Sequence, residues 1–346
     1  MQSVVNAVTG SDNDHFTQTD VPSLNGRTAL VTGGTNGIGF EVARALALAK
    51  ARVLLLSRKG ENGDKAITAI KEAVPSADVE FVECDLGDLV MVKDVADKLC
   101  KREQRLDIVV ADAGVGVNKF DVTKDGIDRH FGVNHLGHFL LINRLLPLLR
   151  HTASLPGTSP PRIISVSSEL HRAASSSVSF ASSSEVSEDV GLGAHGYYAR
   201  SKLANILFTK YGLVERVFVP NKDRIYALAV HPGAVHTDQQ EQFKEAYGAL
   251  FGTIMKTLTV PFMRTPEEGS LSTLWAATSD DIEKKGWNGK YFTDPGQLSE
   301  ESTQAQDPEL GRNLWVLSER LVAEKIGPEA LLSWNVAAKE VQPVSA

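Results

Sequence analysis

The sequence predicts an α/β fold in which one parallel sheet carries helices on both faces. Short apolar runs alternate with helical patterns along most of the chain, and a glycine-rich turn follows the first run. Polar residues stand at the carboxyl ends of most later runs. Sheets of this kind bind ligands beyond the carboxyl ends of their strands, so we expect a single site at that edge.

About seven strands are expected, and they form one domain over residues 25–326. Their apolar runs lie at 27–32, 52–57, 79–82, 106–111, 162–166, 225–230 and 290–293. Helical patterns lie at 40–50, 89–101, 132–149, from about 198 to 214, 266–278 and 307–323. The helix at 132–149 is expected to be amphipathic. Residues 1–24 are predicted to form a flexible leader, and 327–346 a loosely ordered tail.

The composition favours a soluble enzyme over a nucleic-acid-binding protein. The chain has 346 residues and a net charge of -7, whereas phosphate binding needs a basic face. The two cysteines, Cys84 and Cys100, are too few for a disulfide framework and indicate a reducing compartment. The acidic start does not resemble a signal peptide, and no stretch reaches the ~18 apolar residues of a membrane span. We therefore predict a cytoplasmic location.

The turn after the first strand has the composition of a dinucleotide-binding loop. Residues 33–39 read Gly-Gly-Thr-Asn-Gly-Ile-Gly and lead directly into a helix. Glycines allow the backbone to approach a pyrophosphate, and the helix N-terminus then holds the phosphates. The second strand ends in Ser57, Arg58 and Lys59, not in the acid typical of NAD sites. These cations favour NADP, and the alternative is a pair of solvated charges. The glycine-rich turn and the regular alternation of strands and helices together predict a Rossmann-type sheet in the order 3-2-1-4-5-6-7.

A tyrosine and a lysine four residues apart are the candidate catalytic pair. Tyr198 and Lys202 would share one helix face, whereas the neighbouring Tyr197 has no lysine at that spacing. A nearby cation lowers the pKa of a phenol from its usual ~10 and makes it a better general acid or base. The alternative is an ordinary surface helix, because this spacing is common.

Two segments interrupt the alternation of strands and helices. Residues 173–187 are rich in serine and are predicted to form a mobile surface loop. Residues 238–263 are apolar and follow the sixth strand. They are expected to form either one more packed helix or a lid over a lipophilic substrate beside the cofactor.

Together these motifs resemble the short-chain dehydrogenase/reductase superfamily in its classical, single-domain form, over residues 25–325. Its cofactor motif Thr-Gly-x3-Gly-x-Gly is present as Thr32, Gly33, Gly37 and Gly39. Asn36 stands where the extended branch of the superfamily has glycine. Stretches at 134–141, 198–205, 289–292 and 314–315 look most like the retinol dehydrogenase and WW-domain oxidoreductase group.

The resemblance implies a catalytic set and a cofactor site. The catalytic set would be Asn134, Ser168, Tyr198 and Lys202, with Ser167 as the alternative to Ser168. The cofactor contacts would be Gly33, Thr35, Asn36, Gly37, Ile38, Gly39, Arg58, Lys59, Asp85, Leu86, Ala113, Gly114, Tyr198, Lys202, Pro232, Gly233, Val235 and Thr237. No metal site is predicted. The superfamily also implies a homodimer or homotetramer.

The chain departs from the family pattern in two places. The family usually has Asn-Ala-Gly after the fourth strand, and this chain has Asp112, Ala113 and Gly114. That asparagine supports the sheet, so an aspartate would hydrogen-bond similarly or weaken the support. The serine-rich segment also widens the separation between Ser168 and Tyr198 beyond the usual spacing.

The predicted activity is NADP(H)-dependent interconversion of an aldehyde or ketone and its alcohol. By resemblance, Tyr198 would exchange a proton with the substrate oxygen and Ser168 would orient that oxygen. Lys202 would lower the pKa of Tyr198 and hold the nicotinamide ribose, and Asn134 would help to place a water that links Lys202 to solvent. The alternatives are a catalytically silent NADP sensor or scaffold protein and an NAD-dependent alcohol dehydrogenase.

Overall fold

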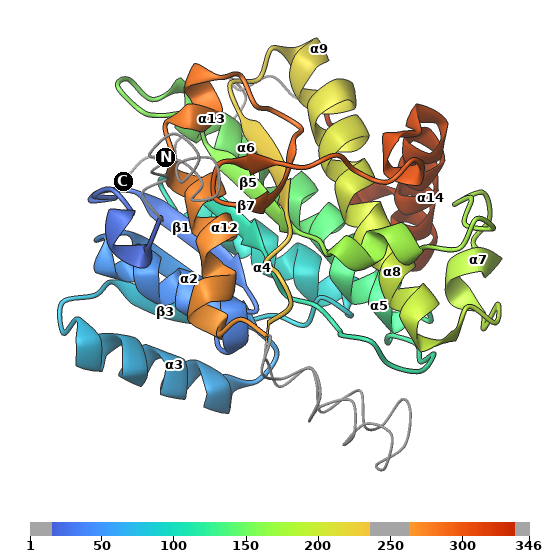
Figure 1. Cartoon of the computed structure of the whole chain (residues 1–346), viewed down its shortest axis with the longest axis horizontal. Helices are drawn as coiled ribbons and strands as arrows, with labels where there is room; N and C mark the ends of the chain where they lie inside the picture. The colour runs from blue at the N-terminus through green and yellow to red at the C-terminus, as the bar shows by residue number, and fades with distance from the viewer. Residues whose placement is uncertain (1–15, 236–262, 336–346) are drawn as a thin grey trace, which may run out of the picture.

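The computed structural model describes residues 16–235 and 263–335, and its centre is one twisted sheet (Figure 1). Eight strands follow the order β3-β2-β1-β4-β5-β6-β7-β8. They are β1 (Thr28–Thr32), β2 (Arg52–Ser57), β3 (Val79–Glu83), β4 (Ile108–Ala111), β5 (Arg162–Val166), β6 (Tyr226–Val230), β7 (Tyr291–Asp294) and β8 (Gln297–Leu298). The first seven pair in parallel, so the predicted order is confirmed. The antiparallel β8 has two residues, too few to leave a pattern in the sequence.

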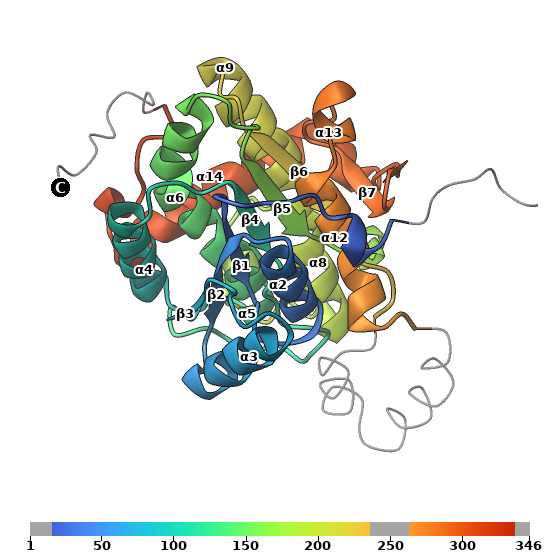
Figure 2. The same cartoon turned by 90° about the vertical axis from the view of Figure 1, so that its left-hand side faces the viewer.

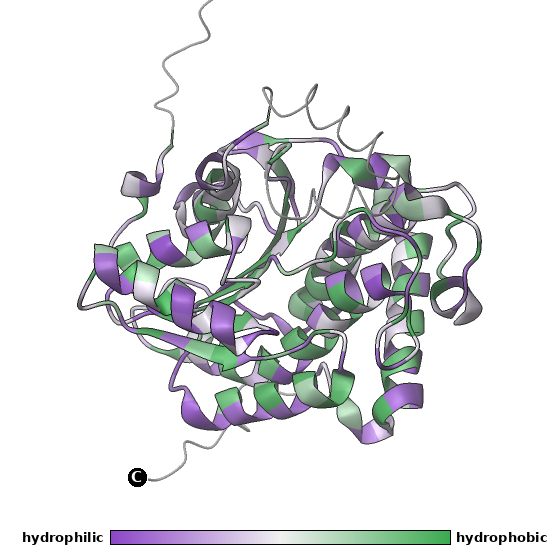
Figure 3. Ribbon diagram, turned by 90° about the horizontal axis from the view of Figure 1, so that it is seen from below, coloured by the Kyte–Doolittle hydropathy of each residue, from purple (hydrophilic) through white to green (hydrophobic). Residues whose placement is uncertain are grey.

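Helices cover both faces of the sheet (Figure 2). They are α2 (Gly37–Leu48), α3 (Gly60–Ala73), α4 (Leu89–Arg102), α5 (Arg129–Phe131), α6 (Gly137–Ser154), α7 (Ser184–Ser187), α8 (Gly193–Leu207), α9 (Val219–Asn221), α12 (Pro266–Thr278), α13 (Asp281–Lys284) and α14 (Pro308–Ile326). Alternate strand residues point to opposite faces. Accordingly, Leu30 packs with α4, α6, α8 and α14, whereas Ala29 and Val31 pack with α2, α3 and α12. Hydrophobic residues are concentrated along the strands and the inner sides of the helices (Figure 3).

The helix predicted at 132–149 is longer and more buried than expected. It runs without a break from α5 through a π-helical segment, η2 (Gly132–Leu136), into α6. The helix has less exposed surface than the predicted amphipathic helix would have, because α6 packs against α4 and almost every residue of α6 is at least partly buried. The segment η2 carries Asn134, and π-helical turns are frequent at functional sites.

Residues 328–335 are not the loose tail that we predicted. The side chain of Asn143, on α6, exchanges two hydrogen bonds with the backbone of Leu332, at 3.0 and 2.8 Å. Arg150 donates to the carbonyl of Trp334 at 2.7 Å. These polar anchors could not be foreseen because their partners lie more than 180 positions apart in the chain.

The serine-rich segment 173–187 is also more ordered than predicted. Its apolar residues Val178, Phe180 and Val186 are buried in the same core cluster as α6 and α8. The amide of Asp128 donates to the carbonyl of Val186 at 2.7 Å. The few apolar residues, rather than the many serines, determine how this segment packs.

The ends of the domain differ from prediction in one further respect. Leu24, assigned to the flexible leader, is buried, and Gln18 donates to Ser270 on α12 at 3.0 Å.

The segment predicted as a lid or packed helix, 238–263, lies outside the described residues except for Met263. Among the helices of the described part, none is long and apolar enough to cross a membrane.

Candidate active site

The glycine-rich turn forms a tight connection between β1 and α2. Gly33 and Gly37 have φ values of +70° and +57°, which favour glycine. The side chain of Asn36 accepts a hydrogen bond from the Gly37 amide at 2.7 Å and caps α2. A Cβ at Gly39 would lie 2.5 Å from the carbonyl oxygen of Gly33. The turn therefore needs its glycines, and it leaves the N-terminus of α2 facing the carboxyl edge of the sheet.

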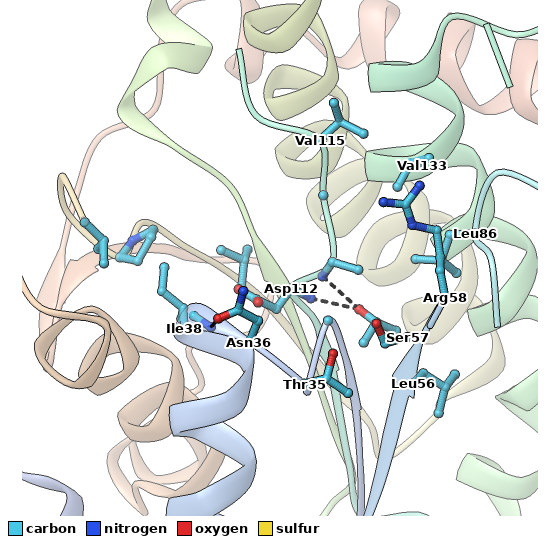
Figure 4. A pocket seen from close by; sticks show the side chains of 18 of the residues that line it. Thr35, Asn36, Ile38, Leu56, Ser57, Arg58, Leu86, Asp112, Val115 and Val133 are labelled. Atoms are coloured by element: carbon cyan, nitrogen blue, oxygen red, sulfur yellow. Dashed lines mark hydrogen bonds between the residues drawn. The ribbon is translucent and has the colours of Figure 1, made fainter. Parts of the chain in front are cut away.

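A cavity of about 380 Å³ lies at this edge, and most of the predicted site residues line it (Figure 4). Those that line it are Gly33, Thr35, Asn36, Gly37, Ile38, Arg58, Leu86, Ala113, Gly114, Ser168, Tyr198, Lys202, Pro232, Gly233 and Val235. Among the residues that the structure describes, four predicted site residues are not part of the lining: Gly39, Lys59, Asp85 and Asn134. Thr237 lies outside the described residues.

Ser168, Tyr198 and Lys202 meet at one end of the cavity. Ser168 follows β5, and its hydroxyl is hydrogen-bonded to the phenol of Tyr198, which is half-buried on α8. Lys202 is one turn further along α8, with its ammonium 5.6 Å from the centre of the Tyr198 ring. The ammonium donates to the carbonyl of Val166 at 2.9 Å. By contrast, the Ser167 hydroxyl donates to the Lys202 backbone carbonyl at 2.8 Å, which favours Ser168 for the catalytic position.

The pKa values of the pair differ from the prediction. Burial lowers the pKa of Lys202 to about 8, and the charge of Asp112 works against that shift. Burial raises the pKa of Tyr198 to about 12, with the Ser168 hydrogen bond opposing and the Asp112 charge adding to the shift. We expected Lys202 to lower the pKa of Tyr198, and the direction is the opposite. Desolvation of the phenol is the largest cause of this rise.

The two adjacent tyrosines have different surroundings. Tyr197 is buried away from the cavity, and its phenol donates to the carboxylate of Asp189. Its ring lies 5.3 Å from the guanidinium of Arg200. Tyr198 lines the cavity and is bonded to Ser168. The tyrosine with a lysine four residues on therefore faces the cavity, and its neighbour packs in the interior.

Asn134 lies behind the cavity and holds two elements together. Its amide oxygen accepts from the Val115 amide at 2.7 Å, and its Nδ2 donates to the Val115 carbonyl at 3.1 Å. The same nitrogen donates to the Ser201 hydroxyl at 2.9 Å. A Cβ on Gly114 would lie 3.0 Å from the Asn134 oxygen and 3.7 Å from the Lys202 ammonium. Asn134 thus fixes the loop after β4 against α8, close to Lys202.

The opposite end of the cavity is formed by the ends of β2 and β3. Arg58 lines it together with Ser57 and Leu86 (Figure 4). Lys59 stands at the N-cap of α3. The carboxylate of Asp85 accepts from the Gly87 amide at 2.8 Å and so stabilises its own turn.

Sequence reasoning missed several residues of the lining. Cys84, Val115 and Val133 contribute apolar surface, and Asn62 comes from α3. Nothing in their local patterns separates them from ordinary core or surface positions. Asp112 also lines the cavity. The sequence marked it only as a departure from a family pattern.

This arrangement defines a dinucleotide-dependent oxidoreductase of the α/β type. The sequence model of the family described as short chain dehydrogenase matches residues 27–248. The chain belongs to this family.

Curated relatives agree with that assignment. The Neurospora crassa protein bli-4, named as a mitochondrial oxidoreductase, is 36% identical over 91% of this chain and 76% of its own length. The human WW domain-containing oxidoreductase is 34% identical over 88% of this chain and 70% of its own. Human polyprenol dehydrogenase is 33% identical over 80% of this chain and 79% of its own length. The predicted family resemblance is confirmed.

A solved structure supports the fold over nearly the whole domain. The crystal structure of an uncharacterized protein from Mycobacterium paratuberculosis has a TM-score of 0.66 and 28% identity. The matched region covers 89% of this chain and 97% of the chain in that crystal structure.

Proposed function

We propose that this protein is an NADP(H)-dependent oxidoreductase that interconverts an aldehyde or ketone and the corresponding alcohol. One observation carries the proposal. The hydrogen-bonded hydroxyls of Ser168 and Tyr198 line the same cavity as the glycine-rich turn. A substrate oxygen at that end would have two hydroxyl donors, which is the environment that carbonyl reduction requires.

The residues present fit a dinucleotide. A Cβ at Gly33 would lie 3.0 Å from the Ala113 backbone, so glycine keeps this approach open, and the N-terminus of α2 favours phosphate. Arg58 at the end of β2 suits the 2′-phosphate of NADP(H), since a guanidinium binds phosphate well. NADPH, when bound, supplies the hydride.

The protein residues then position and exchange a proton. Tyr198 gives its proton to the substrate oxygen during reduction and takes it back during oxidation. Ser168 donates to the same oxygen and fixes its direction. After reduction, Lys202 passes a proton to Tyr198 and regains one from solvent. Lys202 also holds the ribose of the cofactor, while Asn134 keeps the loop after β4 in place beside it.

A lipophilic substrate is the class that we favour. Val115 and Val133 add apolar surface to the cavity, and the sequence of 246–263 is mostly apolar. One relative is named for its action on polyprenol, a long isoprenoid alcohol. Loss of NADPH absorbance with a panel of aldehydes and ketones of increasing chain length tests this choice. Equal turnover of short polar and long apolar substrates would argue against it.

A catalytically silent NADP-binding protein is the second candidate. The raised pKa of Tyr198, about 12, supports it, since little of the phenol is ionised near neutral pH to serve as the base for alcohol oxidation. NADPH binding measured by fluorescence, without turnover of any substrate on the panel, would support this function instead.

NAD-dependent alcohol oxidation is the remaining alternative. Dissociation constants for NADPH and NADH separate it from our proposal, and equal or tighter NADH binding would defeat the argument from Arg58. The cytoplasmic location and the homodimer or homotetramer also stay predictions. The naming of one relative as mitochondrial makes the location worth measuring.

A further inference from the structure

Asp112 places an acid inside the cavity where the family pattern has a neutral amide. It directly follows β4, and no other described residue of the cavity lining carries a carboxylate. Figure 4 shows it beside Asn36 and Ile38, at the end of α2 that is expected to face the cofactor. The sequence difference therefore falls within the site and not on the surface.

The backbone at Asp112 is held firmly. The hydroxyl of Thr32 accepts hydrogen bonds from the amides of Asp112 and Ala113, both at 3.0 Å. The same hydroxyl is 2.8 Å from Nε2 of His138. The Asp112 carboxylate accepts from the amide of Gly39, in the first turn of α2, where the helix dipole favours a negative charge. An asparagine could accept the same bond, so the hydrogen bond alone does not require an acid.

The charge of Asp112 acts on the catalytic pair. The Lys202 ammonium is buried, and Asp112 supplies the negative charge that opposes loss of its proton. The same charge opposes ionisation of Tyr198, while Lys202 in turn favours the ionised carboxylate. His138, the titratable group packed on the other side of Thr32, has its pKa lowered to about 4 by burial. It is therefore neutral near pH 7 and does not replace Asp112.

We propose that Asp112 is a positioning residue, which acts as the counter-charge of the buried Lys202 and sets the pH range in which the Tyr198–Lys202 pair exchanges its proton. The proposal rests on the proposed function for its kinetic consequence. Its electrostatic part concerns the protein alone. Without the negative charge of Asp112, the Tyr198–Lys202 pair loses its first proton at a lower pH.

Asp112→Asn is the decisive variant, because the amide keeps an acceptor for the Gly39 amide and removes only the charge. The matched control is Asp107→Asn, at the other end of β4, where the carboxylate binds Arg105 and the Thr28 amide. The titration of Lys202 is followed by NMR of the full chain with 13C-labelled lysine, and the signal is assigned by its loss in Lys202→Met. The pH profile of kcat/KM for alcohol oxidation is the second readout.

In Asp112→Asn we expect the Lys202 midpoint to fall by about one pH unit. The acid limb of kcat/KM should move in the same direction, and Asp107→Asn should move neither. An unchanged Lys202 midpoint, even with reduced turnover, would overturn the proposal and leave Asp112 a structural support. If no substrate is turned over, the proposed function fails, yet the NMR comparison still decides whether Asp112 is the counter-charge.

Discussion

Both edges of the sheet contain charged residues and a cavity, but the charged side chains have different kinds of partner at the two edges. The cavity at the amino edge is the larger, about 700 Å³ against about 380 Å³. There Arg52 pairs with Glu103 and Asp78, at 3.0 and 2.8 Å. At the carboxyl edge, Lys202 is buried and Asp112 is half-buried, and both have mainly backbone partners. The incompletely paired titratable groups, rather than the size of the cavity, are the reason why we propose the carboxyl edge as the place of the chemistry.

The largest expected effect comes from the adjacent tyrosines of α8. Tyr198→Phe removes the proposed proton donor and should lower kcat by roughly 10²–10⁴-fold. Phenylalanine keeps the aromatic ring in the cavity lining and removes only the hydroxyl, so the dissociation constant of NADPH should stay nearly unaltered.

Tyr197→Phe is the control, measured in the same turnover assay and by thermal unfolding. It breaks the bond to Asp189 and should lower the melting temperature with little direct effect on chemistry. Comparable turnover in the two variants would remove Tyr198 from the mechanism.

The next effect concerns stability and pH at the carboxyl edge. Burial raises the pKa of Asp112 to about 6, above its ordinary 3.8. Because folding raises this pKa, the protonated Asp112 contributes stability that is fully present below its unfolded pKa of 3.8. This stability is lost as the pH rises through about 6. Relative to Asp112→Asn, the native protein should therefore lose up to about 3 kcal/mol between pH 4 and pH 7. Urea unfolding at several pH values measures this, and a constant difference across the range would contradict the raised pKa of Asp112.

The amino edge should respond with stability alone. Asp107 accepts from the Thr28 amide at 2.9 Å and from Arg105 at 2.6 Å. Asp107→Asn weakens these charge-assisted bonds, and we expect a loss of about 1–2 kcal/mol in the free energy of unfolding. Denaturant unfolding checks the loss, and NADPH turnover at a temperature where the variant is folded should match the native rate. A large drop in turnover would mean that the two edges are coupled.

The sequence predicted the sheet well because its evidence is local. Apolar runs marked the seven parallel strands, and the cavity that most of the predicted site residues line lies at their carboxyl ends. The packing of 173–187 was missed because three buried apolar residues decide it against a background of serine. The pKa direction of Tyr198 was wrong because spacing reveals the nearby cation but not the depth of burial. Desolvation depends on every element packed around the phenol, and no single motif encodes it.

The smallest effect tests the far end of the carboxyl-edge cavity. Arg58 lines it beside Ser57, and its guanidinium is our choice for the 2′-phosphate of NADP(H). Arg58→Ala should weaken NADPH binding by about tenfold, or about 1.4 kcal/mol, and leave NADH binding nearly unchanged. Lys59→Ala is the matched control, because Lys59 is adjacent in sequence but is not part of the described lining. Fluorescence titration gives both constants. Equal weakening of NADPH and NADH would show that Arg58 holds a part common to both cofactors, and the preference for NADP(H) would then need another source.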